Sequence, residues 1–130
     1  MDKLSTSYSY SYEEYQVQTV LEKLVPNEEN LRPGEVDGSL LPHDFYVRNG
    51  IPQIKLDGET VVEVKAALSI SSLKLVESLF DTQSQNGYNL LVVYFNSSLS
   101  EKPDEKTANG KKLLFYSFDE LKRIAKVRIK

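Results

Sequence analysis

A run of six apolar residues, Leu90 to Phe95, constrains the fold of this chain more than any other feature. A strand that is apolar on both faces must be covered on both faces, which is typical of a central strand in a sheet with helices on either side. The run is much shorter than the roughly 20 apolar residues that cross a bilayer. The sequence therefore predicts an α/β protein, with an α+β mixed sheet flanked by helices.

The segments before this run predict two helices and a group of strands between them. An amphipathic helix is expected over 13–25, with a polar loop over 27–41 after it. Residues 44–65 favour a meander of two or three antiparallel strands, with turns at Asn49-Gly50 and Asp57-Gly58. A second helix is expected over 66–85.

The segments after the run predict one more strand and a last helix. The loop over 96–110 is polar, and Leu113 to Tyr116 is apolar and typical of a strand. Ser117 is a good N-cap for a helix with an acidic first turn. We expect a flexible N-terminus over 1–12 and a single domain over 13–130. Whether this domain is a fragment of a longer chain stays open.

Composition excludes several classes of site and suggests a compartment. The chain has no cysteine, which excludes disulfides, zinc-thiolate sites and cysteine nucleophiles, and suits a reducing cytoplasm. The N-terminus lacks the apolar core of a signal peptide. We therefore expect a cytoplasmic protein without membrane contact.

Charge is unevenly distributed along the chain. Residues 111–130 hold seven basic and two acidic residues, net +5, so that residues 1–110 carry −8 of the total charge of −3. The acidic bulk disfavours tight nucleic-acid binding by this domain alone, because cations supply most of the non-specific affinity for phosphates. The basic end is interpreted either as a contact for a nucleic-acid backbone or as a solvated helix end that matches the helix dipole.

The chemically suggestive residues are Asp44 and the pair Glu63 and Lys65 in Glu63-Val64-Lys65. Strand side chains alternate between faces, so Glu63 and Lys65 are expected on the same side. Two carboxylates and an ammonium group that converge on one face suit a hard cation and a water nucleophile. The alternative is a surface strand whose charges are solvated and pair locally.

In this order and spacing the chain resembles the PD-(D/E)XK nuclease superfamily over roughly 13–95. His43 stands between Pro42 and Asp44, which departs from the Pro-Asp of the family pattern, and Asp37 is a second candidate aspartate. The resemblance implies a restriction-endonuclease-like αβββαβ core with a C-terminal strand-helix extension. It also implies a metal-dependent nuclease that cleaves phosphodiester bonds, with DNA as the expected substrate.

The resemblance further implies the site residues and the cofactor. Asp44, Glu63 and Lys65 would be the catalytic residues, and Asp44 and Glu63 would also hold Mg²⁺ or Mn²⁺. Several related families add a glutamate from the first helix, and a helical wheel places Glu13 in the apolar stripe, with Glu14 at its edge and Glu22 pointing away. We therefore take Glu13 as the expected third metal ligand, with an acidic first turn that complements the helix dipole as the alternative.

Two other functions stay open at this stage. The first is a catalytically inactive nuclease-fold module for binding or assembly, and the second is a scaffold or immunity-type protein without nucleic-acid contact. By analogy with the superfamily, a nuclease of this size suits restriction or phage defence as a homo-oligomer or attached to a larger sensor or ATPase chain.

Overall fold

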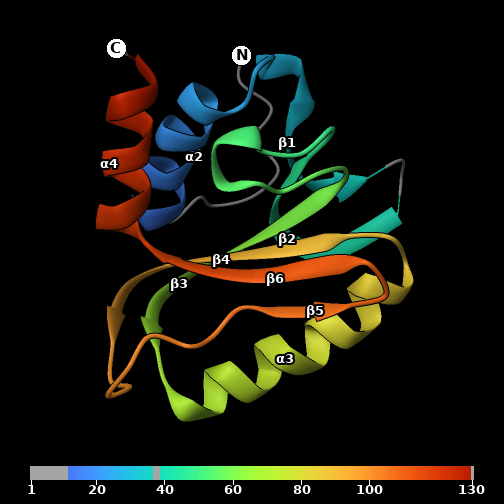
Figure 1. Cartoon of the computed structure of the whole chain (residues 1–130), viewed down its shortest axis with the longest axis vertical. Helices are drawn as coiled ribbons and strands as arrows, with labels where there is room; N and C mark the ends of the chain where they lie inside the picture. Colours follow the sequence, from blue (N-terminus) through green and yellow to red (C-terminus); the bar gives the residue numbers. More distant parts are fainter. Residues whose placement is uncertain (1–11, 37–38, 130) are drawn as a thin grey trace.

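The computed structural model describes residues 12–36 and 39–129, which form a mixed six-stranded sheet with helices on both faces (Figure 1). The predicted α+β fold class is confirmed. The elements in chain order are α2 (Tyr12–Leu24), η1 (Glu28–Asn30), β1 (Leu31–Val36), β2 (Ser39–Val47), η2 (Pro52–Ile54), β3 (Thr60–Leu68), α3 (Ile70–Gln85), β4 (Asn89–Ser97), β5 (Lys106–Ala108), β6 (Lys111–Ser117) and α4 (Phe118–Ile129).

The sheet combines an antiparallel half with a parallel half. Its strand order is β1-β2-β3-β4-β6-β5. The first three strands form an antiparallel meander, but it begins at β1, before the range 44–65 over which the meander was predicted. Strands β3, β4 and β6 are parallel, with α3 as the crossover from β3 to β4. In Figure 1, α2 and α4 lie together on one face of the sheet and α3 lies on the other.

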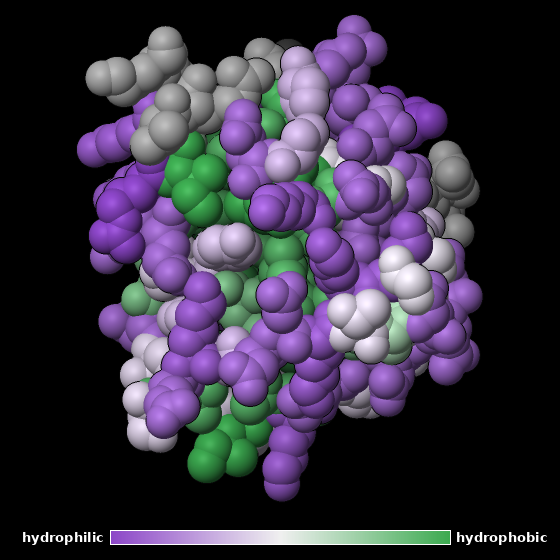
Figure 2. Space-filling view, viewed as in Figure 1, coloured by the Kyte–Doolittle hydropathy of each residue, from purple (hydrophilic) through white to green (hydrophobic). Residues whose placement is uncertain are grey.

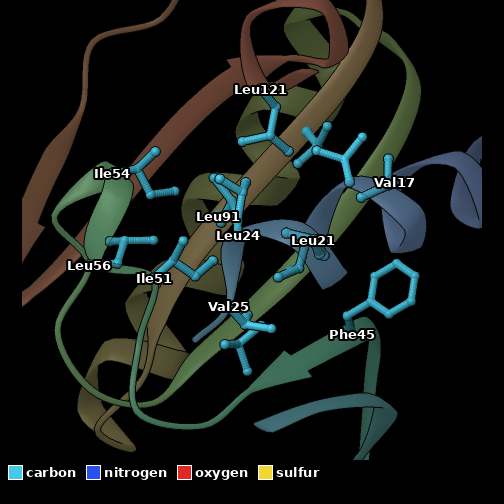
Figure 3. Close-up of a cluster of buried hydrophobic side chains, with 14 of the residues drawn as sticks. Val17, Leu21, Leu24, Val25, Phe45, Ile51, Ile54, Leu56, Leu91 and Leu121 are labelled. Atoms are coloured by element: carbon cyan, nitrogen blue, oxygen red, sulfur yellow. The ribbon is translucent and has the colours of Figure 1, made fainter. Parts of the chain in front are cut away.

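The central strand β4 is buried on both faces, as its apolar run predicts. Leu91 and Val93 enter the core beneath α2 and α4, and Leu90 and Val92 enter the core beneath α3. Figure 3 shows the first of these cores, in which side chains of two helices, the sheet and the loop after β2 converge. Its labelled residues are Val17, Leu21, Leu24, Val25, Phe45, Ile51, Ile54, Leu56, Leu91 and Leu121.

The expected polar loop over 27–41 is wrong, because most of it forms β1 and the start of β2. Leu31 pairs with Val47 at one end of this hairpin, and Val36 pairs with Ser39 at the other. The register shifts between Pro33 and Glu35, where one residue of β1 lies opposite the four residues 41–44 of β2. An edge strand tolerates proline, so backbone pairing of β1 with β2 overrides the polar composition.

The segment 53–56, which lies between the two predicted turns and would be the middle strand of a three-stranded meander, is not a strand. Pro52–Ile54 is a short 3₁₀ turn, and only the single bridge between Ile51 and Leu56 resembles a strand pair. Ile51, Ile54 and Leu56 are all buried, a spacing that alternation does not produce. Gly50 closes this loop with φ of +79°, and a Cβ there would lie 2.1 Å from the Leu56 carbonyl oxygen. The Asn49-Gly50 turn therefore leads into the loop over 51–56 and does not connect two strands of a hairpin.

The second helix begins later than predicted, because β3 continues alongside β4 until Leu68 pairs with Ser97. Ser69 then caps α3 through a reciprocal pair of hydrogen bonds with Ser72. Ser117 caps α4 as predicted, since its Oγ accepts the Glu120 N–H and its own N–H donates to the Glu120 carboxylate. The expected loop over 96–110 contains the short strand β5.

The surface of the described residues is mostly hydrophilic in the view of Figure 2, with apolar side chains at the bottom over the start of α3. Ile70 and Leu75 of α3 are exposed. None of the helices in the described part of the chain has both the length and the apolar character needed to span a membrane. The flexible N-terminus predicted over 1–12 lies outside the described residues except for Tyr12, which begins α2.

Candidate metal centre

Asp44 lies at the point where β2 and β3 stop pairing. The ladder between these strands ends at the pair Phe45 and Val62, and the same register would next place Asp44 opposite Glu63. The Asp44 Oδ2 accepts a hydrogen bond of 2.6 Å from the Val64 N–H. The Asp44 carboxylate therefore accepts the Val64 N–H in place of a backbone carbonyl of the neighbouring strand. This hydrogen bond fixes the orientation of the Asp44 side chain.

Glu63 and Lys65 project from the same side of β3, as strand alternation predicts. The Lys65 Nζ lies 4.0 Å from the Glu63 Oε1, and the side chains are 30% and 11% exposed respectively. The negative charge of Glu63 also acts on the Asp44 carboxyl. The structure thus brings together the three residues that the sequence motif singled out.

A third carboxyl group reaches this place from α2, and it belongs to Glu14. The side chain of Glu14 forms a hydrogen bond with Asp44. The helical wheel selected Glu13 instead, because Glu13 lies in line with the buried residues Val17 and Val20. The apolar stripe of α2 faces the core, whereas the carboxyl groups lie beside the core. Glu14, at the edge of the stripe, therefore contacts Asp44. Asp37, the alternative aspartate, lies outside the described residues.

The environment of Asp44 favours its protonated form. Burial raises the pKa of Asp44 from 3.8 to about 8, with further contributions from the Glu14 hydrogen bond and from the negative charges of Glu63 and Glu14, while the Val64 N–H opposes the rise. A hydrogen bond between two carboxyl groups needs a proton between them. At neutral pH, without a cation, Asp44 and Glu14 therefore share a proton.

This raised pKa predicts how stability depends on pH. The folded-state pKa of Asp44 exceeds its usual value, so its contribution to stability is full below about pH 4 and is lost as the pH rises through about 8. Between pH 5 and pH 9, without metal, we expect the free energy of unfolding to fall by about 1–3 kcal/mol after allowance for partial exposure.

Denaturant unfolding of the parent and of Asp44→Asn at both pH values would measure this effect. Asparagine retains an acceptor for Val64 and does not ionise, so the variant should lose much less stability over the same range. Asp81→Asn, which changes an exposed carboxylate on α3, should behave as the parent does. Equal pH dependence in the parent and in Asp44→Asn would contradict the assignment.

The carboxyl groups fit a hard divalent cation, although they do not already enclose one. Within residues 12–36 and 39–129, no group of three or more acidic, histidine or cysteine side chains is arranged to hold a metal ion. Mg²⁺ usually keeps several waters and takes only one or two carboxylates from the protein. Asp44 with Glu63 or Glu14 would supply this number, and a cation would replace the proton that Asp44 and Glu14 share.

Tyr94 is a neighbour of the site that the sequence analysis did not single out. It pairs with Lys65 across β3 and β4, and paired side chains of adjacent strands lie about 5 Å apart on one face. Burial raises the pKa of Tyr94. The sequence signal that could have indicated Tyr94 is its hydroxyl group, which stands in the otherwise apolar run from Leu90 to Phe95.

Comparisons of the chain with protein-family models, with curated proteins and with solved structures found no match. The chemistry of Asp44, Glu63, Lys65 and Glu14 is therefore the basis on which a function can be assigned.

Proposed function

We propose that this chain is a metal-dependent nuclease of the PD-(D/E)XK type, which hydrolyses phosphodiester bonds of nucleic acid, with DNA as the expected substrate. The observation that carries the proposal is the convergence of Asp44, Glu63 and Lys65 where β2 and β3 part. An order of elements running α2, β1, β2, β3, α3, β4 supports it, because this is the αβββαβ order that the resemblance implies.

The carboxylates would hold the cation, and the lysine would act on the reacting groups. Asp44 and Glu63 are the proposed ligands for Mg²⁺ or Mn²⁺, and Glu14 takes the place expected for Glu13. A bound divalent cation stabilises negative charge on a phosphate and makes water a better nucleophile near neutral pH. The Lys65 ammonium would orient the attacking water or neutralise charge that develops on the phosphate. The Val64 N–H would keep Asp44 in position before the cation arrives.

An inactive module or a scaffold explains this cluster less well. Carboxylates brought together in a partly buried place repel each other and lose hydration, which lowers stability unless a cation or a proton compensates. A scaffold would gain nothing from such a group next to a half-buried lysine. A nuclease needs it, because the cation that it attracts takes part in the reaction.

Low intrinsic affinity for nucleic acid is part of the proposal, since the chain carries a net charge of −3. A homo-oligomer, or attachment to a larger sensor or ATPase chain in restriction or phage defence, would supply the missing affinity. Cleavage assays should therefore use low salt and a high protein concentration.

The test is cleavage of plasmid DNA and of a labelled single strand in the presence of Mg²⁺, Mn²⁺ or a chelator. We expect cleavage with either metal and none with the chelator. Asp44→Asn, purified in parallel, should be inactive, which controls for a contaminating nuclease, and Glu13→Gln should cleave as the parent does.

Binding of nucleic acid without cleavage under every condition would favour the inactive module instead. Neither binding nor cleavage would favour the scaffold. Equal cleavage by the parent and Asp44→Asn would exclude the proposed site.

A further inference from the structure

We propose that the pocket beside the second half of β6 binds an extended basic peptide, whose arginine or lysine side chain enters the pocket while its backbone pairs with β6. The pocket has a volume of about 410 Å³, which lies in the range of ligand-binding pockets. It lies between β6 and the loop that leads into β5 (Figure 1), and residues 102–105 and 114–116 line it. This inference concerns a protein partner and does not depend on the proposed nuclease function.

The pocket is present because β5 stops pairing with β6 before β6 ends. Lys106 pairs with Leu113, and the same register would next place residues 102–105 opposite residues 114–117. However, β5 begins only at Lys106, whereas β6 runs on to the end of that range. Pro103 lies in the departing loop and lacks the N–H that a strand ladder needs. Among residues 12–36 and 39–129, no strand therefore lies opposite the end of β6 on this side.

The backbone of Phe115 faces the pocket. The Lys112 N–H is directed toward β4, where it donates to the Asn89 side chain. Backbone groups along a strand alternate between its two neighbours, so the N–H and C=O groups of Phe115 are directed to the opposite side. The Phe115 side chain is buried in the core beneath α3, so its backbone is the part that lines the pocket. A peptide strand could therefore add to the sheet at Phe115.

The side chains at the pocket already bind one ammonium group, which is that of Lys102. The Lys102 Nζ lies 3.2 Å and 3.1 Å from the two carboxylate oxygens of Glu120. It also lies 4.7 Å from the centre of the Tyr116 ring. A carboxylate and an aromatic face are common binding groups for ammonium and guanidinium ions. The contacts of Lys102 therefore indicate which kind of ligand side chain the pocket would accept.

The charge at the pocket favours a cationic ligand. Asp104 and Glu105 belong to its wall and are exposed. Together with Lys102 and Glu120, they give three negative charges and one positive charge. Burial acts to raise the pKa of Glu120, but the Ser117 N–H and Lys102 lower this pKa below its usual value, so that Glu120 stays ionised. The pocket therefore repels a phosphate and attracts a basic side chain.

The test follows binding of a peptide to the isotopically labelled full chain by NMR and by calorimetry. The probe is a capped peptide of sequence Thr-Val-Arg-Val-Thr, in which β-branched residues favour an extended strand. A matched peptide carries citrulline in place of arginine, because citrulline has the shape of arginine without its charge. The protein variants are Glu120→Gln, Lys102→Ala and, as a control, Asp119→Asn.

We expect saturable binding of the arginine peptide, with the largest amide shifts at residues 114–117, and at least about tenfold weaker binding of the citrulline peptide. Glu120→Gln keeps an acceptor for the Ser117 N–H and should weaken binding of the arginine peptide by about tenfold. Lys102→Ala should instead strengthen it by about threefold or more, because the competing ammonium group is removed. Asp119→Asn removes an exposed carboxylate from the same helical turn and should bind as the parent does.

No saturable binding up to about 1 mM peptide, in both the parent and Lys102→Ala, would overturn the inference. Equal affinity for the arginine and citrulline peptides would also overturn it, as would amide shifts that avoid residues 114–117. An equal loss in Asp119→Asn and Glu120→Gln would show that net charge governs binding, which contradicts a role for the pocket. The comparison of the two peptides uses the parent alone, so it decides the inference even if Glu120→Gln unfolds.

Discussion

Lys65→Ala is expected to slow phosphodiester cleavage by about 10²–10³-fold, the usual cost of removing one group that stabilises charge in a transition state. The Lys65 Nζ lies 4.0 Å from Glu63 at the opening between β2 and β3. Its positive charge is placed where charge would develop on a phosphate held by the carboxylates. Cleavage time courses at saturating Mg²⁺ would measure the loss.

The same substitution should change stability little. The Lys65 side chain is 30% exposed and its ion pair is long, so the pair is worth less than about 1 kcal/mol. Lys106→Ala is a matched control, because Lys106 forms a 2.8 Å ion pair with Glu77 away from the site. It should cleave as the parent does.

Thermal melts of both variants would complete the comparison. Cleavage by Lys65→Ala within a few-fold of the parent would contradict the catalytic role. A large fall in its melting temperature would show that Lys65 is structural.

The helices and the central strand of the fold could be predicted because their signals are local. The continuous apolar run of β4 and the stripe of α2 reflect burial directly, and the Ser117 cap is a short-range hydrogen-bond pattern. The edge strand β1 could not be predicted, since its pairing with β2 depends on backbone contacts rather than on apolar side chains. The loop over 51–56 could not be predicted either, because it buries its apolar residues through a 3₁₀ turn and not through strand alternation.

The site shows the same division between local and distant information. Strand alternation is a local rule, and it placed Glu63 and Lys65 on one side. The position of Asp44 depends on where β2 and β3 part, which the register determines. The choice between Glu13 and Glu14 depends on how α2 is rotated over the sheet, and a helical wheel gives only the direction of the core.

The most direct test of the proposed metal centre is titration of Mn²⁺ into the metal-free protein, followed by calorimetry and by the electron paramagnetic resonance signal of free Mn²⁺. The pH should be above 8, where the proton at Asp44 no longer competes with the cation. We expect saturable binding by the parent. Asp44→Asn and Glu63→Gln should each weaken it by about a hundredfold, and Glu14→Gln by at least about tenfold.

Glu13→Gln is the matched control for this titration, because it neutralises the adjacent carboxylate on the same helical turn. Its affinity for Mn²⁺ should equal that of the parent. Binding that is lost in Asp44→Asn, Glu63→Gln and Glu14→Gln but retained in Glu13→Gln is the result that the proposed metal centre predicts. A parent that binds no Mn²⁺ above pH 8, or an Asp44→Asn variant that binds it as tightly as the parent, would contradict it.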